Sequence, residues 1–257
     1  MNYIVFDLEW NQSPGGKKYS NSRLPFEIIE IGAVKMNEQR EVVDVFQRLV
    51  KPQVYNWIHD SIHEVIHVDY KDLADGDFFE QAVREFLEWC GEKYVFCTWG
   101  NQDVMELQRN MKYYGMLSLL PGPVTYYDVQ KIYGICHEEA GGRRSLEFAI
   151  DQMGIPKSQD FHRALTDARY TGEIFRTLDP VSVQVNSSID VYQNPKSKKE
   201  EIFLSYPTYD QYVSREFADK EKVMKDREVA STRCPVCHMP AKRKIRWFMN
   251  NSRAYES

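Results

Sequence analysis

Two acidic residues, Asp7 and Glu9, lie one position apart at the end of an apolar run over residues 2–10. In a strand, residues i and i+2 point to the same face, so both carboxylates would lie side by side. Two ionised carboxylates this close repel each other unless a divalent cation lies between them. The pair is therefore a candidate metal site, and a solvated strand end without a ligand is the alternative.

The run that carries these acids predicts a strand buried on both sides. Val5 shares the parity of the acids, whereas Ile4, Phe6 and Leu8 point to the opposite face, so both faces are apolar. Two further strands are expected over residues 26–36 and 41–50. Because the links between these three strands are short, they predict an antiparallel meander.

A third acid, Asp103, lies in the first turn of a helix expected over residues 102–114, just after a short buried strand at 93–99. An acid in a first turn interacts favourably with the helix dipole and needs no other function. The same position, just past a strand end, is where open α/β sheets place ligands. Taken alone, Asp103 fits both interpretations.

His162 and Asp167 precede and enter a helix expected to end near Leu178. On a regular helix these two side chains would be about 140° apart and would not converge. If both serve one site, His162 must lie before the helix or in its fraying first turn. The small Ala164 and Ala168 would let this helix approach the sheet closely.

Composition limits the architecture and the class of protein. A chain of 257 residues with 42% hydrophobic content can bury one substantial core and a small appendage. The sequence has neither a long apolar run nor a signal-peptide pattern, so we expect a soluble, cytoplasmic protein without a membrane partner. Five cysteines, an odd and sparse set, favour a reducing compartment over a disulfide framework.

Charge is distributed unevenly along the chain. Residues 196–257 carry 14 basic against 9 acidic residues, a net of +5, and residues 1–195 carry 19 against 29, a net of −10. A basic segment beside an acidic body can bind a polyanion, and a solvated surface is the alternative.

Together these segments resemble the DEDDh 3′–5′ exonucleases, the DnaQ-like branch of the ribonuclease H-like superfamily, and within it the Eri1-like group. The resemblance covers about residues 1 to 178, and its motifs occur in the family's order. The matching stretches are 6–11 (FDLEWN), 30–35 (EIGAVK), 98–107 (TWGNQDVMEL) and 161–168 (FHRALTDA).

The resemblance implies an α/β fold, a mixed five-stranded sheet flanked by helices, in a domain over residues 1–180. It also implies that four acids hold two Mg²⁺ or Mn²⁺ ions and that His162 is the general base. The four acids are Asp7, Glu9, Asp103 and Asp167. Hydrolysis of a phosphodiester suits such a site, because two metals stabilise the attacking and leaving oxygens and hard oxygen ligands suit these ions.

Substrate contacts follow less directly from the resemblance. Leu8, Trp10 and Asn11 lie within or just after the metal pair, where the family contacts the terminal nucleotide, and the indole of Trp10 can stack on a base. Trp10 could equally be a core residue. His67 stands where related enzymes usually have glycine, so the contact with the substrate end is expected to differ there.

The stretch around His67 also matches a different motif. His63, Glu64 and His67 form a literal His-Glu-x-x-His, the signature of zinc peptidases in which both histidines bind zinc and the glutamate activates water. This interpretation leaves the four acids and His162 without a role. Ordinary surface histidines are the other alternative.

The sequence pattern changes after residue 180. Residues 181–233 predict a charged linker or helical extension, with a strand within 181–194 and a helix over 216–229. Residues 234–257 begin with Cys234 and Cys237, spaced like the first knuckle of a zinc ribbon. The second pair would start at positions 253–258, so we expect either a site completed outside this sequence or by another chain, or an unmetallated pair.

The sequence thus predicts a metal-dependent 3′–5′ exonuclease that acts on single-stranded 3′ ends, with RNA favoured over DNA. A regulatory module that binds nucleic acid or protein without catalysis is the alternative, and the complete set of acids argues against it. The oligomeric state cannot be derived from these residues.

Overall fold

The computed structural model describes residues 1–57, 70–137, 142–157, 162–206, 209–230, 237, 239–240, 248–250 and 254–256. The chain divides into two compact units, Met1–Asp190 and Val191–Ser257, which are described separately. The first unit continues past residue 180 because helix α8 (Pro180–Val185) and strand β6 (Ser188–Asp190) belong to it.

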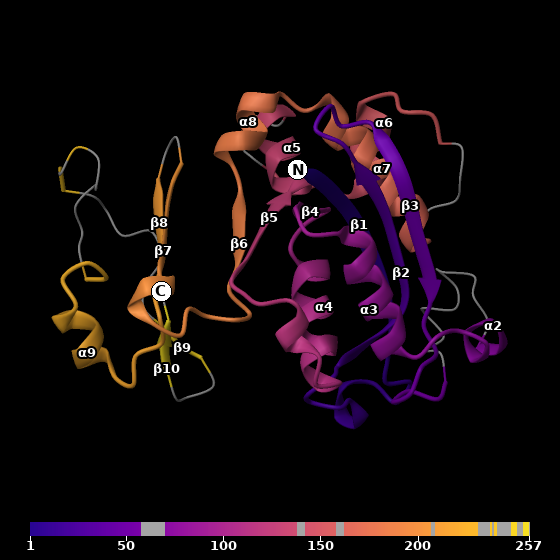
Figure 1. The fold of residues 1–257 in the computed structure, drawn as a ribbon, viewed down its shortest axis with the longest axis horizontal. Coiled ribbons are helices and arrows are strands. Elements are labelled where there is room, and N and C mark those ends of the chain that lie inside the picture. The colour runs from indigo at the N-terminus through magenta and orange to yellow at the C-terminus, as the bar shows by residue number, and fades with distance from the viewer. Residues whose placement is uncertain are drawn as a thin grey trace. The chain divides into compact units, whose positions relative to one another are not determined.

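In the described part of the first unit, six strands form one mixed sheet in the order β3-β2-β1-β4-β5-β6 (Figure 1). The pairs β1–β4 and β4–β5 are parallel, and the other three are antiparallel. The first five strands are β1 (Asn2–Gln12), β2 (Phe26–Met36), β3 (Val42–Leu49), β4 (Tyr94–Thr98) and β5 (Val124–Asp128). The expected meander and mixed sheet are confirmed.

The sheet differs from the expected five strands by its edge strand. The short β6 pairs with Val124, Thr125 and Tyr126 of β5, so the strand expected within residues 181–194 joins the main sheet. The sixth strand was missed as part of this sheet because its three residues carry no alternating pattern of their own.

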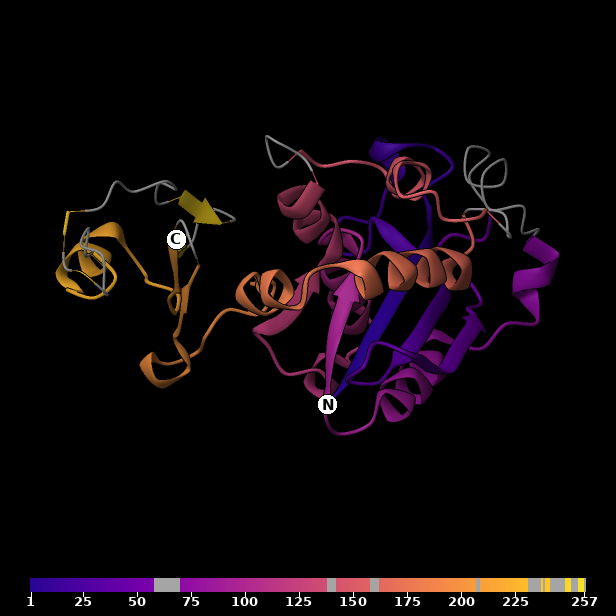
Figure 2. The ribbon, with the colours of Figure 1, turned by 90° about the horizontal axis from the view of Figure 1, so that it is seen from above.

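Helices cover both faces of the sheet (Figure 2). On one face, α3 and α4 enclose Ile4 and Phe6 of β1, and on the other face α5, α6 and α7 enclose Val5. This division follows the alternation of the strand, which sends neighbouring side chains to opposite faces. In the described residues of this unit, the helices besides α8 are α2 (Tyr70–Ala74), α3 (Phe79–Cys90), α4 (Gln102–Tyr113), α5 (Val129–His137), α6 (Leu146–Gln152) and α7 (Ala164–Thr177), with short 3₁₀ turns at Lys17–Tyr19 and Leu117–Leu119.

Helix α7 packs unusually close to β2. A Cβ atom built on Gly32 would lie 2.0 Å from the backbone nitrogen of Leu165, so no side chain fits at position 32. Ala164 and Ala168 are fully buried on the same helix. The expectation that small residues let this helix approach the sheet is therefore confirmed, and Gly32 contributes from the strand side.

The described part of the second unit contains two antiparallel strand pairs, β7–β8 and β9–β10, and a short helix. Its elements there are a 3₁₀ turn (Lys198–Glu200), β7 (Ile202–Ser205), β8 (Asp210–Val213), α9 (Lys220–Lys225), β9 (Phe248–Asn250) and β10 (Ala254–Glu256). The prediction of a helix over 216–229 is wrong in length. Asp219 caps α9 by accepting a hydrogen bond from the Lys222 backbone nitrogen at 2.8 Å, and the helix ends six residues later, with Val223 as its buried side chain.

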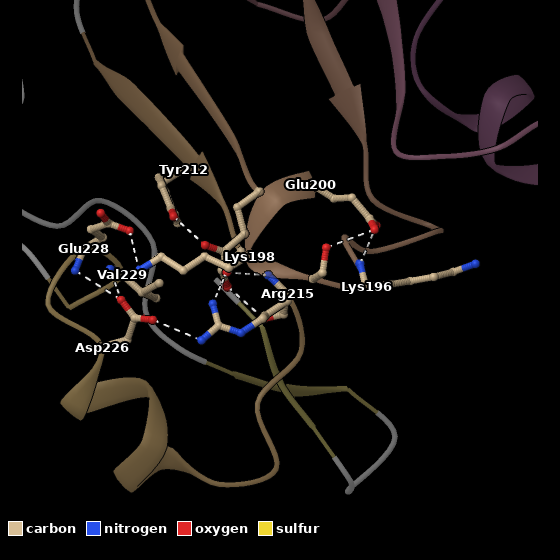
Figure 3. A network of polar contacts seen from close by, with 11 residues as sticks. Lys196, Lys198, Glu200, Tyr212, Arg215, Asp226, Glu228 and Val229 are labelled. Carbon is tan, nitrogen blue, oxygen red and sulfur yellow. Dashed lines mark hydrogen bonds and ion pairs between the residues drawn. The ribbon is translucent and has the colours of Figure 1, made fainter.

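A polar network connects the hairpin of the second unit to α9 (Figure 3). Arg215 forms ion pairs with Glu201 and, at 3.1 Å, with Asp226, and its guanidinium lies 4.5 Å from the centre of the Phe217 ring. The Tyr212 hydroxyl donates to Glu201 at 2.6 Å. Because the side chain of Glu201 is buried, loss of Arg215 would leave its charge without the compensation that this network gives it.

Several expectations fall on residues that the structure does not describe. They concern the segment around His63, Glu64 and His67 and the knuckle residue Cys234. None of the helices in the described residues combines the length and apolar character needed to cross a bilayer.

Candidate active site

The end of β1 carries Asp7 and Glu9 beyond the reach of its neighbour β4. Residues Asn2 to Val5 pair with β4, whereas β1 continues to Gln12. On its other side β1 remains paired with β2, with a bulge between Glu9 and Trp10. The last part of β1 therefore has one edge without a strand partner, and that edge borders the site.

Asp103 reaches this unpaired edge from the next connection. The turn after β4 passes through Gly100, whose φ of 101° suits glycine, and α4 then begins with Asp103 in its first turn. The Asp103 Oδ1 atom accepts a hydrogen bond from the Leu8 backbone nitrogen at 3.2 Å. The third acid therefore satisfies a β1 backbone group that has no strand partner at that edge.

His162 and Asp167 come from the start of α7. His162 precedes the helix with a φ of 67°, so the prediction that it lies outside the regular helix is confirmed. Its backbone nitrogen donates to Asp167 Oδ2 at 3.2 Å. This turn places both residues at one site, which a continuous helix could not do.

The three segments line one cleft of about 440 Å³. The cleft lies along the carboxyl ends of β1 and β4, where open α/β sheets bind ligands. The five predicted catalytic positions all line it, namely Asp7, Glu9, Asp103, His162 and Asp167.

Burial and mutual repulsion raise the pKa values of the four acids. Burial raises the pKa of Asp7 well above its ordinary range, and the charges of Asp103 and Glu9 raise it further. Burial also raises the pKa of Glu9 to about 8, with Asp167 as the largest charged contribution. The pKa of Asp103 is raised to about 7 and that of Asp167 to about 6, both mainly by burial and both opposed by a backbone hydrogen bond. A cation between these groups would remove this repulsion.

The geometry of the acids fits a hard divalent cation. Asp7, Glu9 and Asp167 each offer one carboxylate oxygen, and these three oxygens lie within 4.8 Å of one another. Asp167 Oδ1 is buried, and no hydrogen-bond partner for it exists among the described residues. Oxygen ligands of this kind suit Mg²⁺ or Mn²⁺. Asp103 lies outside this group of three and lines the same cleft.

An ion pair between buried Glu30 and partly exposed Arg163 escaped sequence reasoning. Glu30 of β2 faces Glu9 across the strand pair and is only 2% exposed. Arg163 donates to both carboxylate oxygens of Glu30 at 3.1 Å, and Gln47 donates to one of them at 2.6 Å. The signal was present, because an acid inside an apolar strand needs a partner and an arginine adjoins His162.

The predicted substrate contacts have different surroundings. Leu8 is 3% exposed and belongs to the core. It also lines the cleft. Trp10 is half-buried and lines the cleft. Asn11 is fully buried, and its Nδ2 donates to the Trp57 carbonyl at 2.8 Å. Asn11 therefore holds a loop in place, and its contact with a nucleotide stays a prediction.

Three further lining residues carried no recognisable signal. Trp99 follows β4, Gln130 lies in the first turn of α5, and Arg143 lies in the connection between α5 and α6. Because β4 and β5 are parallel neighbours, the segments that follow them begin at the same edge of the sheet, and this brings the three residues to one cleft.

Comparison with known proteins agrees with this geometry. The RNase_T family model, described as an exonuclease, matches residues 4–175. Among curated proteins, the probable 3′–5′ exonuclease KapD of Bacillus subtilis (strain 168) is 27% identical over 180 residues, which are 68% of this chain and 83% of KapD. DNA polymerase III PolC-type of Staphylococcus aureus (strain bovine RF122 / ET3-1) is 27% identical over 173 residues, 67% of this chain and 11% of that protein.

Solved structures share the fold. The nuclease domain of 3′hExo, a DEDDh family member bound to rAMP, has a TM-score of 0.62 at 18% identity and covers 73% of this chain and 96% of its own. Escherichia coli exonuclease I in complex with a dT13 oligonucleotide has a TM-score of 0.54 at 13% identity and covers 68% and 40%. The family match spans all four stretches singled out in the sequence, from residue 6 to residue 168. The chain belongs to the RNase_T exonuclease family.

Proposed function

We propose that this protein is a metal-dependent 3′–5′ exonuclease that hydrolyses phosphodiester bonds at single-stranded 3′ ends. One observation carries the proposal, namely that four acids and a histidine from three distant segments line one cleft. A structural role alone does not explain this arrangement, because buried acids that repel one another destabilise the fold unless a ligand compensates them.

Asp7, Glu9, Asp103 and Asp167 would hold two Mg²⁺ or Mn²⁺ ions. When bound, such ions lower the pKa of an attacking water and stabilise charge on the attacking and leaving oxygens of a phosphodiester. The hydrogen bond from the His162 backbone to Asp167 fixes the start of α7 beside these acids. A ring nitrogen of His162 then accepts the proton of the attacking water, as an imidazole does in general base catalysis.

RNA is the proposed preference over DNA. Support comes from the resemblance to the Eri1-like group and from the fold shared with two solved structures. One is the nuclease domain of 3′hExo bound to rAMP, and the other is a 3′-exonuclease described as recognising the 3′ end of a histone mRNA stem-loop. Exonuclease I, solved with a dT13 oligonucleotide, shares the same fold, so DNA belongs in the test. A contact with the 2′-hydroxyl is what would separate the two substrates.

Digestion of end-labelled oligomers tests the proposal. With Mg²⁺, a 5′-labelled single-stranded RNA should give a ladder of shortening products, whereas a 3′-labelled RNA should release labelled mononucleotide from the start. The same DNA sequence should be degraded more slowly, and a duplex with blunt ends should resist. Asp7→Ala should abolish all of these reactions. Activity that survives in Asp7→Ala, or labelled mononucleotide released first from the 5′ end, would contradict the proposal.

A further inference from the structure

Arg143 introduces a positive charge into a cleft that is otherwise dominated by acids. Among the described residues that line the cleft, it is the one arginine or lysine. No step of the chemistry proposed for the four acids and His162 uses Arg143. An arginine at such a place needs either a structural explanation or a ligand.

Structural contacts hold Arg143 at one end of the cleft. Its Nη2 lies 3.6 Å from Asp128 Oδ2, and the side chain of Asp128 is only 3% exposed. Asp128 itself is fixed at the end of β5, where its Oδ1 accepts a hydrogen bond from the Lys131 backbone nitrogen at 2.9 Å. Because β5 lies two strands from β1, the strand that carries this partner of Arg143 lies about 10 Å from the strand that carries Asp7 and Glu9.

The neighbouring residue fixes the backbone at this end of the cleft. The carbonyl of Arg144 accepts hydrogen bonds from Trp99 Nε1 at 3.1 Å and from Gln130 Nε2 at 2.7 Å. The Arg144 guanidinium lies 4.8 Å from the centre of the Phe148 ring and is not among the groups that line the cleft. Two adjacent arginines therefore point to different surroundings, and only Arg143 borders the cleft.

The ion pair with Asp128 does not fully explain why an arginine stands at position 143. Its side chain is 61% exposed, so its contact with Asp128 contributes little to stability. Guanidinium groups present several N–H donors that match the oxygens of a phosphate. In an exonuclease that removes nucleotides from the 3′ end, the chain continues from the cleaved bond only in the 5′ direction. The next phosphate on that side is the anion available to a group outside the acid cluster.

We propose that Arg143 binds a phosphate on the 5′ side of the cleaved bond, so that the enzyme selects polynucleotides over substrates with a single phosphodiester. This inference rests on the proposed function and adds a residue that determines substrate length. The contact also offsets the repulsion between the polyanion and the acids of the cleft.

Substrates of different length test the inference. One is a nucleoside 5′-phosphate p-nitrophenyl ester, which has a single phosphodiester, and the other is a single-stranded hexanucleotide. Arg143→Ala should lower kcat/KM for the hexanucleotide by about ten-fold to a hundred-fold, the range for hydrogen bonds to a charged group. It should change kcat/KM for the ester by less than about two-fold, since that substrate does not reach Arg143. The matched control Arg144→Ala should change neither.

Two further variants separate charge from loop structure. Arg143→Gln keeps a hydrogen-bond donor near Asp128 and should lose hexanucleotide activity as Arg143→Ala does, whereas Arg143→Lys should recover part of it. Loss of one phosphate contact should also lower the slope of log affinity against log salt by about 0.7 for a single strand.

The outcomes distinguish the two proposals. Equal loss on both substrates, or no loss on either, would overturn the role of Arg143 while leaving the exonuclease intact. A wild-type protein that cleaves neither substrate would overturn both the proposed function and the inference that rests on it.

Discussion

Replacing Asp103 by Asn should stabilise the metal-free protein while removing its activity. Asp103 is 5% exposed, and its Oδ1 accepts a hydrogen bond from the Leu8 backbone nitrogen. An asparagine at position 103 keeps an oxygen for that bond and has no charge. Burial raises the pKa of Asp103 from 3.8 to about 7, which means that the folded protein resists ionising this group.

The sign of the effect follows from linkage between proton binding and folding. Between about pH 4 and pH 7 the folded protein keeps a proton on Asp103 that the unfolded chain has lost, so the free energy of unfolding falls as pH rises through this window. Three pKa units at about 1.4 kcal/mol each give about 4 kcal/mol at pH 8. At pH 4.5 the same calculation gives about 1 kcal/mol.

Urea unfolding in EDTA measures this difference. Asp103→Asn should exceed the wild type by about 4 kcal/mol in free energy of unfolding at pH 8 and by about 1 kcal/mol at pH 4.5. Glu92→Gln, which alters an exposed acid of the same unit, should change the free energy of unfolding by less than about 0.5 kcal/mol at either pH. Mg²⁺ or Mn²⁺ at pH 8 should stabilise the wild type and should stabilise Asp103→Asn much less.

A different result would refute the reasoning. If Asp103→Asn were no more stable than the wild type in EDTA at pH 8, burial would not disfavour the ionised form of Asp103 as described. If the advantage were the same at both values of pH, its source would be packing or hydrogen bonding and not ionisation.

Three other substitutions have definite expected outcomes. Gly32→Ala should lower the free energy of unfolding by about 3 kcal/mol, because its Cβ would collide with the backbone of α7, whereas Gly172→Ala meets only side-chain atoms, at 3.3 Å or more, and should cost far less. Arg163→Met should cost about 2 kcal/mol after allowance for the partly exposed guanidinium, and adding Glu30→Gln should recover part of it, both measured by urea unfolding. Asp167→Asn should lose most of the increase in thermal midpoint that Mn²⁺ gives the wild type, and an unchanged increase would exclude Asp167 as a ligand.

The positions of some site residues can be predicted from the sequence because strand alternation and helix geometry are local properties, and their roles stay predictions. Asp7 and Glu9 follow from the period of β1, and the need for His162 to precede α7 follows from helix geometry alone. Asn11 was assigned to the substrate because it adjoins the metal pair. The structure adds a hydrogen bond from its amide to the backbone carbonyl of Trp57, 46 residues away, and no local pattern reveals such a partner.

Long-range pairing also explains what the sequence did not reveal. The bond between Glu30 and Arg163 joins residues 133 positions apart. Arg143 reaches the cleft because its partner Asp128 lies at the end of β5, which is paired with β4. The three-residue β6 and the short α9 depend on tertiary contacts and capping more than on periodicity.

The hollow of the active site arises from a mismatch in strand length. β1 has 11 residues and β4 has five, so the shorter strand stops while the longer one runs on. If β4 were lengthened by two or three residues in register, its backbone would pair with β1 at the position where Asp103 now accepts a hydrogen bond from Leu8. In any redesign of this scaffold, the residue at which β4 ends should therefore control the depth of the cleft, whatever side chains line it.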